Sequence, residues 1–163
     1  MKKTVIILTL LSLFGLAADP APPGADCAGA KIAWLAHDPA AAAAREKNLP
    51  LVLYFRRDGC RYCEMLLKNG FEREDISCFI NRRFVAALID TGRQPELKKK
   101  YRVAGEPTVW FLDPAGKEID FFMGYVPPER LSLILRYVGD GAYRQMTFAE
   151  FERRENQKGG NPE

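Results

Sequence analysis

Two cysteines separated by two residues form the part of this chain that is best suited to chemistry. Cys60 and Cys63 follow an apolar run at residues 51–55 and open a segment that we expect to be helical. The first sulfur then lies at a helix N-terminus, where unpaired backbone N–H groups and the helix dipole favour a negative charge. Because the thiolate is the reactive form of cysteine, this location favours reactivity at neutral pH. Strand, short loop and Cys-x-x-Cys helix together indicate a thiol–disulfide redox site.

Two other interpretations of Cys60 and Cys63 stay open at this point, a structural disulfide and one half of a metal site. A zinc ion would need about two more ligands. The chain has one histidine and no second Cys-x-x-Cys motif. We therefore favour the redox interpretation and expect neither a metal nor a cofactor.

The remaining cysteines differ in their surroundings. Cys78 lies in an apolar helical segment at residues 76–80, where a buried thiol is the usual finding. Cys27 lies in a segment rich in proline and glycine and could be a free thiol, a partner of Cys78 or a link to another chain. His37 adjoins Asp38 at an expected helix start, and we expect it at the surface.

The N-terminal residues have the pattern of an export signal. A basic start, a short apolar stretch and small residues near its end predict a signal peptide at residues 1–18. An uncleaved membrane anchor is the alternative. Residues 19–30 are expected to form a linker, residues 31–155 the folded domain and residues 156–163 a disordered tail. Export would place the cysteines in a compartment that permits disulfides.

The charge balance excludes one class of partner. Lysine and arginine number 24 against 21 acidic residues, and two of the lysines belong to the expected signal peptide. The domain is thus nearly neutral, and we expect it not to bind nucleic acid. The basic run at residues 98–100 is interpreted as a solvated helix face.

Apolar runs and turn residues predict alternating strands and helices. The expected strands are residues 31–35, 51–55, 84–89, 108–112 and 118–122. The expected helices start at Asp38 as N-cap, Cys60, Asp75, Pro95, Pro127 and Thr147, where Thr147 and Glu150 form a capping box. Gly70 is the expected stop of the cysteine helix. This order predicts an α/β fold in which a central mixed sheet is flanked by helices, with a short helical extension at the C-terminus.

Three motifs together resemble the thioredoxin superfamily: the Cys60/Cys63 site, the segment Gly105-Glu106-Pro107-Thr108 and the hairpin at residues 111–117. The resemblance covers about residues 32–138. Within the superfamily, the chain is similar to exported thioredoxin-like proteins, among them those linked to sulfur oxidation or cytochrome c maturation.

The resemblance implies roles for residues around the cysteines. It implies that Pro107 is cis and packs beside the pair, and that the backbone of Glu106 receives an extended substrate chain. Arg61 and Tyr62 replace the usual Gly-Pro between the cysteines, and we expect Tyr62 to be exposed to partner chains. We therefore assign Pro107, Glu106, Tyr62 and Arg61 to substrate binding.

Other positions depart from the thioredoxin pattern. Gly59 replaces a tryptophan, Tyr54 stands where thioredoxin keeps a buried acid, and Glu64 replaces a lysine. Arg61 should favour the Cys60 thiolate, whereas Glu64 and Glu106 should oppose it.

The function that we predict is an exported thiol–disulfide oxidoreductase. Its Cys-x-x-Cys dithiol would reduce disulfides of exported proteins and would be recharged by a membrane reductant conduit. A disulfide oxidase or isomerase is the first alternative. A non-enzymatic binding module or copper-handling protein of the same fold is the second.

Overall fold

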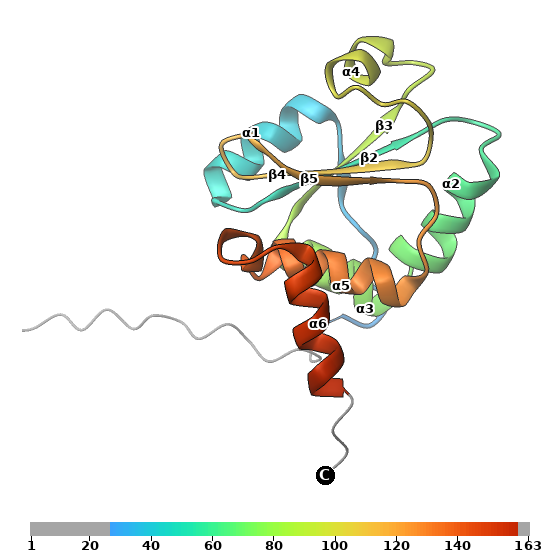
Figure 1. Ribbon diagram of the computed structural model, residues 1–163. Coiled ribbons are helices and arrows are strands. Elements are labelled where there is room, and N and C mark those ends of the chain that lie inside the picture. Colours follow the sequence, from blue (N-terminus) through green and yellow to red (C-terminus); the bar gives the residue numbers. More distant parts are fainter. Residues whose placement is uncertain (1–26, 160–163) are drawn as a thin grey trace, which may run out of the picture.

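Five strands form a single mixed sheet in the order β1-β3-β2-β4-β5 (Figure 1). The computed structural model describes residues 27–159, so the expected signal peptide, residues 19–26 of the linker and residues 160–163 lie outside the described residues. The strands are β1 (Trp34–Leu35), β2 (Leu51–Arg56), β3 (Val85–Asp90), β4 (Thr108–Leu112) and β5 (Glu118–Met123). The helices are α1 (His37–Lys47), α2 (Arg61–Leu66), α3 (Glu74–Arg83), α4 (Pro95–Lys100), α5 (Pro128–Gly139) and α6 (Phe148–Gly159), with a π-helical turn η1 (Leu67–Phe71) and a 3₁₀ turn η2 (Ala142–Arg144).

The strand directions confirm the predicted mixed sheet. β2 and β1 both run parallel to β3, while β4 is antiparallel to β2 and β5 is antiparallel to β4. The β4–β5 turn is closed by Asp113, whose carboxylate accepts hydrogen bonds from the backbone N–H groups of Ala115 and Lys117. An aspartate that binds the backbone two residues ahead is typical turn chemistry.

Helices cover both faces of the sheet. On one face α2, α3 and α5 bury a cluster that includes Tyr54, Phe71, Ile76 and Leu131. On the other face α1 packs its alanines against a second cluster that includes Phe55 and Trp110. Figure 1 shows α1 on one side of the strands and α3 and α5 on the other. Because β2 is buried on both faces, its sequence is a nearly continuous apolar run.

The C-terminal extension packs on α5. The Tyr137 ring lies 5.4 Å from that of Phe148 and 5.6 Å from that of Phe151. The capping box is present, since the Thr147 N–H donates to a carboxylate oxygen of Glu150 at 2.8 Å. α6 continues to Gly159, four residues beyond the end that the sequence predicted. An ion pair of 2.6 Å between Arg136 of α5 and Glu155 of α6, itself the last residue of the predicted domain, holds that part of the helix.

The start of α1 differs from the prediction. The N-cap is Ala36 rather than Asp38, and no side chain caps the helix. Asp38 instead binds the ring of His37, with Nδ1 and Oδ1 2.6 Å apart. His37 is buried, not at the surface. Its Nε2 lies 2.9 Å from the Tyr101 hydroxyl. The tertiary contact with Tyr101 is what local sequence could not show.

Gly70 does not end the cysteine helix. The helix continues through η1 to Phe71, and Gly70 is buried inside this turn. A Cβ atom at residue 70 would lie 2.8 Å from Cδ2 of Leu131. Glycine is therefore needed for the close approach of η1 to α5, and its C-terminal role was predicted wrongly.

The segment before β1 is fastened to α3. A disulfide joins Cys27 to Cys78, with 5.6 Å between their Cα atoms. Ser77 Oγ donates to the Ala30 carbonyl at 2.7 Å, and Asn81 Nδ2 donates to the Lys31 carbonyl at 2.8 Å. Cys78 is thus no free buried thiol, and of the three alternatives for Cys27 the structure contains the pairing with Cys78. Among the described residues, no helix has the length and apolar character needed to span a membrane.

Candidate functional site

Cys60 and Cys63 lie at the end of the sheet where β2 leads into α2. They form a disulfide, and their Cα atoms are 5.2 Å apart. Cys60 is 9 % exposed and Cys63 is 1 % exposed. The first sulfur is therefore the one that another molecule can reach, and the second lies behind it.

The loop before α2 sets the position of Cys60. Gly59 has φ of +71°, a conformation in which a side chain is strained, so glycine is favoured where the family has a tryptophan. Cys60 is the N-cap of α2, and its Sγ accepts a hydrogen bond from the Cys63 N–H at 3.2 Å. This N–H would stabilise a thiolate at Cys60 once the disulfide is reduced.

The loop before β4 lies against the pair. The Glu106–Pro107 peptide bond is cis, and the Glu106 carbonyl oxygen lies 3.7 Å from Cys60 Sγ. The loop is joined to the end of β5, because the Gly124 N–H donates to the Pro107 carbonyl at 2.7 Å. Thr108 closes it with a hydrogen bond of 2.6 Å from its hydroxyl to the Gly105 carbonyl. Backbone groups of residue 106 thus border the sulfur of Cys60.

The two residues between the cysteines face outward. Arg61 is exposed, and Tyr62 is 60 % exposed. Glu64 is exposed as well. The structure therefore brings Cys60, Cys63, Glu106 and Pro107 together. Arg61 and Tyr62 are exposed at the edge of this group, which we call the rim of the site.

The carboxylate of Glu106 points away from Cys60 into a cluster of polar groups. Its Oε1 accepts hydrogen bonds of 2.7 Å from Thr91 Oγ1 and from Lys98 Nζ, and Arg57 Nε lies 3.8 Å from its Oε2. Burial opposes the charge on Glu106, but the hydrogen bonds from Lys98 and Thr91 and the charges of Lys98 and Arg57 outweigh it, so the pKa lies below its ordinary value. The two cations offset the opposition to the Cys60 thiolate that the sequence alone predicted.

Tyr54 lies beneath the cysteine helix. Its hydroxyl donates to the Cys63 carbonyl at 2.7 Å, and its ring packs 5.8 Å from Trp34 and 5.0 Å from Phe71. Burial raises the pKa of the Tyr54 hydroxyl well above its ordinary value. At this position the protein holds a neutral hydrogen-bond donor, whereas the pattern of thioredoxin has an acid.

Residues 37–139 match the family described as the thioredoxin-like domain. The chain belongs to the thioredoxin-like family.

Solved structures agree with this assignment. A thioredoxin from Thermus thermophilus is similar to this thioredoxin-like protein at 27 % identity and a TM-score of 0.61, over 68 % of the chain and 87 % of the thioredoxin. A putative disulphide-isomerase from Bacteroides thetaiotaomicron is similar at 26 % identity and a TM-score of 0.58, over 67 % of the chain and 93 % of that protein.

A curated relative is much longer than this chain. Spermatogenesis-associated protein 20 of Rattus norvegicus is 28 % identical over 96 residues, which are 53 % of the chain. The match covers 12 % of that relative, so the chain spans only a small part of its length.

Sequence reasoning missed several groups of this thioredoxin-like site. Arg57 of the loop before α2, Thr91 of the turn after β3 and Lys98 of α4 meet at Glu106. Lys98 was interpreted as part of a solvated face. Lys98 stands in α4, whereas Glu106 stands in the loop before β4, so no periodic pattern within one element links the two. A lysine and a glutamate near the site were visible in the sequence, but their pairing depends on the path of the loop between them.

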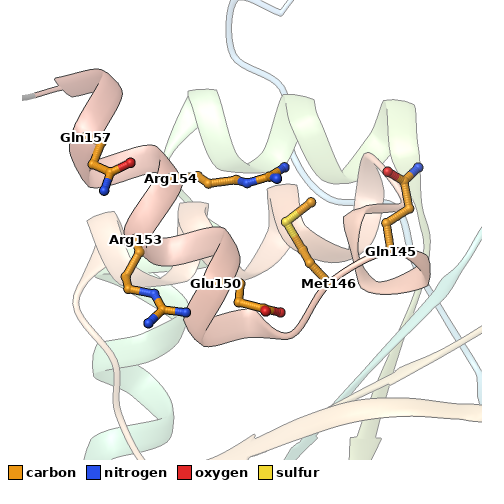
Figure 2. A pocket seen from close by; sticks show the side chains of 6 residues that line it. All are labelled: Gln145, Met146, Glu150, Arg153, Arg154 and Gln157. Carbon is orange, nitrogen blue, oxygen red and sulfur yellow. The ribbon is translucent and has the colours of Figure 1, made fainter.

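Hollows lie at different places on the described part of the chain. One of about 300 Å³ lies beside Cys63 and is lined also by Arg56, Glu64, Leu67 and Lys68. Another, of about 520 Å³, lies between η2 and α6 and contains none of the predicted site residues (Figure 2). Its lining is Gln145, Met146, Glu150, Arg153, Arg154 and Gln157. Within residues 27–159, no group of three or more His, Cys, Asp or Glu side chains is arranged to hold a metal ion.

Proposed function

We propose that this protein is an exported thiol–disulfide oxidoreductase that reduces disulfides of extracytoplasmic proteins through Cys60 and Cys63. The observation that carries the proposal is the position of the pair. Cys60 is the more exposed sulfur, caps α2 and lies 3.7 Å from the carbonyl of Glu106 in the loop before β4. Such a site combines a stabilised thiolate with backbone groups that can pair with a substrate chain.

The reaction has two exchange steps. The Cys60 thiolate attacks one sulfur of a substrate disulfide, forming a mixed disulfide and releasing the other substrate sulfur as a thiolate, which takes up a proton. The Cys63 thiolate then attacks Cys60 Sγ, so that the Cys60–Cys63 disulfide forms and the second substrate sulfur leaves as a thiolate. Two electrons pass from the dithiol to the substrate.

The surrounding groups support this order of attack. Cys63 is buried, and its backbone nitrogen lies 3.2 Å from Cys60 Sγ. Because it lies behind Cys60, Cys63 is placed to resolve the mixed disulfide rather than to start it. Pro107 and the backbone of Glu106 would hold the substrate strand, while Arg61 and Tyr62 would contact it at the rim.

The electron donor and the compartment belong to the proposal as well. The basic and apolar residues at the start of the chain favour export, and a disulfide between Cys27 and Cys78 suits an oxidising compartment. A membrane reductant conduit that carries electrons outward would then return the pair to the dithiol form.

The test is a reduction assay on insulin disulfides with the purified, reduced protein in stoichiometric amounts. We expect one disulfide to be reduced for each oxidised Cys60–Cys63 pair. A Cys60→Ser protein that reduces insulin as well as the wild type would exclude this role for Cys60.

A second candidate function has one observation in its favour. The similarity to a putative disulphide-isomerase, at 26 % identity, favours transfer in the oxidising or isomerising direction. Titration of the Cys60–Cys63 pair against glutathione gives its redox potential, which separates the two functions. A difference of about 30 mV corresponds to 1.4 kcal/mol for a two-electron couple. A potential well above that of the glutathione pool would support the isomerase or oxidase.

A further inference from the structure

Three loops at the active end of the sheet meet at one carboxylate. Glu106 belongs to the loop before β4, Thr91 and Lys98 belong to the connection after β3 and to α4, and Arg57 belongs to the loop that leads to Cys60. The side chain of Glu106 is 6 % exposed. Thr91 is itself fixed, because its backbone N–H donates to the Arg56 carbonyl at the end of β2 at 2.9 Å. The carboxylate therefore joins the loop before β4 to the ends of both central parallel strands.

The cluster also determines where the backbone of residue 106 lies. The main-chain carbonyl of Glu106 faces Cys60 Sγ, while its side chain extends to Thr91 and Lys98. One residue thus contributes its backbone to the reactive surface and its side chain to an internal anchor. A buried carboxylate with two short hydrogen bonds has much less freedom than an exposed one.

We propose that Glu106 is a positioning residue, whose carboxylate, held by Thr91 and Lys98, fixes the loop before β4 so that its backbone can pair with an extended substrate chain beside Cys60. The proposal rests on the proposed function, since it concerns substrate capture by that same site. The backbone of residue 106 was expected to receive the substrate, whereas its side chain was expected only to oppose the Cys60 thiolate.

The test compares four variants of the full chain. Glu106→Gln removes the charge and keeps the shape, Lys98→Met removes the principal cation, and the double variant removes both. Glu118→Gln is the matched control, because Glu118 pairs with Arg102 at the start of β5, where it is exposed and no part of the site. Thr91→Val, which deletes one hydrogen bond, serves if Glu106→Gln does not fold.

Two measurements are made on each variant. The first is the KM and kcat for reduction of a protein disulfide, in an assay that regenerates the dithiol with dithiothreitol. The second is the pH profile of Cys60 alkylation by iodoacetamide, which reports the charge around the sulfur without a substrate chain. Circular dichroism at the assay temperature confirms that each variant is folded.

A positioning role of Glu106 and a purely electrostatic role predict different changes in KM and in the midpoint of Cys60 alkylation. For Glu106→Gln we expect KM to rise about tenfold while kcat stays within about twofold, because a loosened loop weakens substrate capture. The alkylation midpoint should move to lower pH in Glu106→Gln and to higher pH in Lys98→Met. In the double variant the midpoint should return near that of the wild type, whereas KM stays raised.

A KM for Glu106→Gln within about twofold of the Glu118→Gln control would overturn the inference. So would a double variant whose KM returns to the wild-type value, because charge alone would then explain the effect. If the wild-type protein reduces no protein disulfide at all, the proposed function fails instead, and the two failures are thereby distinguished.

Discussion

The protein contains two disulfides that differ in almost every physical respect. Cys60 and Cys63 are three residues apart, at the open end of the sheet, beside the Glu106 carbonyl. Cys27 and Cys78 are 51 residues apart and join the segment before β1 to α3. The first closes a loop so short that it constrains the unfolded chain little, and the second closes a long one. Under the proposed function, the same kind of bond serves exchange chemistry at one place and attachment at the other.

The largest expected effect concerns the exchange site. Cys60→Ser should lower the rate of disulfide reduction by about a thousandfold or more, because it removes the nucleophile itself. Cys63→Ser should instead accumulate a mixed disulfide, measured by mass spectrometry after incubation with insulin. A Cys27→Ser/Cys78→Ser double variant is the control and should keep its activity. An equal loss of disulfide reduction in that control would contradict the proposal that only the Cys60–Cys63 disulfide takes part in exchange.

The attachment disulfide should affect stability instead of turnover. Loop-closure entropy predicts that Cys27→Ser/Cys78→Ser lowers the free energy of unfolding by about 4 kcal/mol. The measurement is urea unfolding of the oxidised proteins, followed by circular dichroism. Cys60→Ser/Cys63→Ser is the matched comparison, and we expect it to lose much less. The comparison would be reversed if the short-range pair proved the more stabilising of the two.

The hydroxyl beneath the exchange site should contribute modestly. Tyr54→Phe removes a hydrogen bond to the Cys63 carbonyl, which still accepts the bond from the Leu67 N–H. We expect the free energy of unfolding to fall by about 1 kcal/mol, with turnover nearly unchanged. Tyr143→Phe, within η2, is the control. Loss of turnover in Tyr54→Phe alone would show that this hydroxyl takes part in proton movement around Cys63.

The smallest expected effect is on the pH dependence of stability. The pKa of Glu106 is lowered from its ordinary value of 4.5, so folding favours its ionised form. That contribution is present above pH 4.5 and is lost as the pH falls through the lower folded value. The stability difference between wild type and Glu106→Gln should therefore shrink on acidification below that pH, in urea titrations at pH 7 and pH 3. A difference that grows in acid would contradict this sign.

Local sequence predicted the elements better than their contacts. The apolar runs of β2, β3 and β4 were visible because buried parallel and central strands carry apolar side chains on both faces. Cys60 and Cys63 were visible because the Cys-x-x-Cys pattern is a matter of sequence spacing alone. His37 and Gly70 were misjudged, since Tyr101 and Leu131, which determine their surroundings, lie more than sixty residues away in the chain.

The cluster at Glu106 shows the same limit within the site itself. Glu106 was assigned to the site for its backbone, on the basis of family resemblance. The partners of its side chain come from the loop before α2, the turn after β3 and helix α4, and no periodic pattern links them to residue 106. Such a cluster becomes visible when the strand order places the ends of β2 and β3 beside the loop before β4.

The attachment of Cys27 to α3 also determines how the domain would bear a mechanical load. β1 has only two residues paired with β3, so a pull on the chain just ahead of it would otherwise peel that strand away. With the covalent bond to Cys78 in place, the tension passes directly into α3 and the apolar cluster beneath it. The domain can thus be held by the segment before β1 without loading the two-residue pairing of β1 with β3.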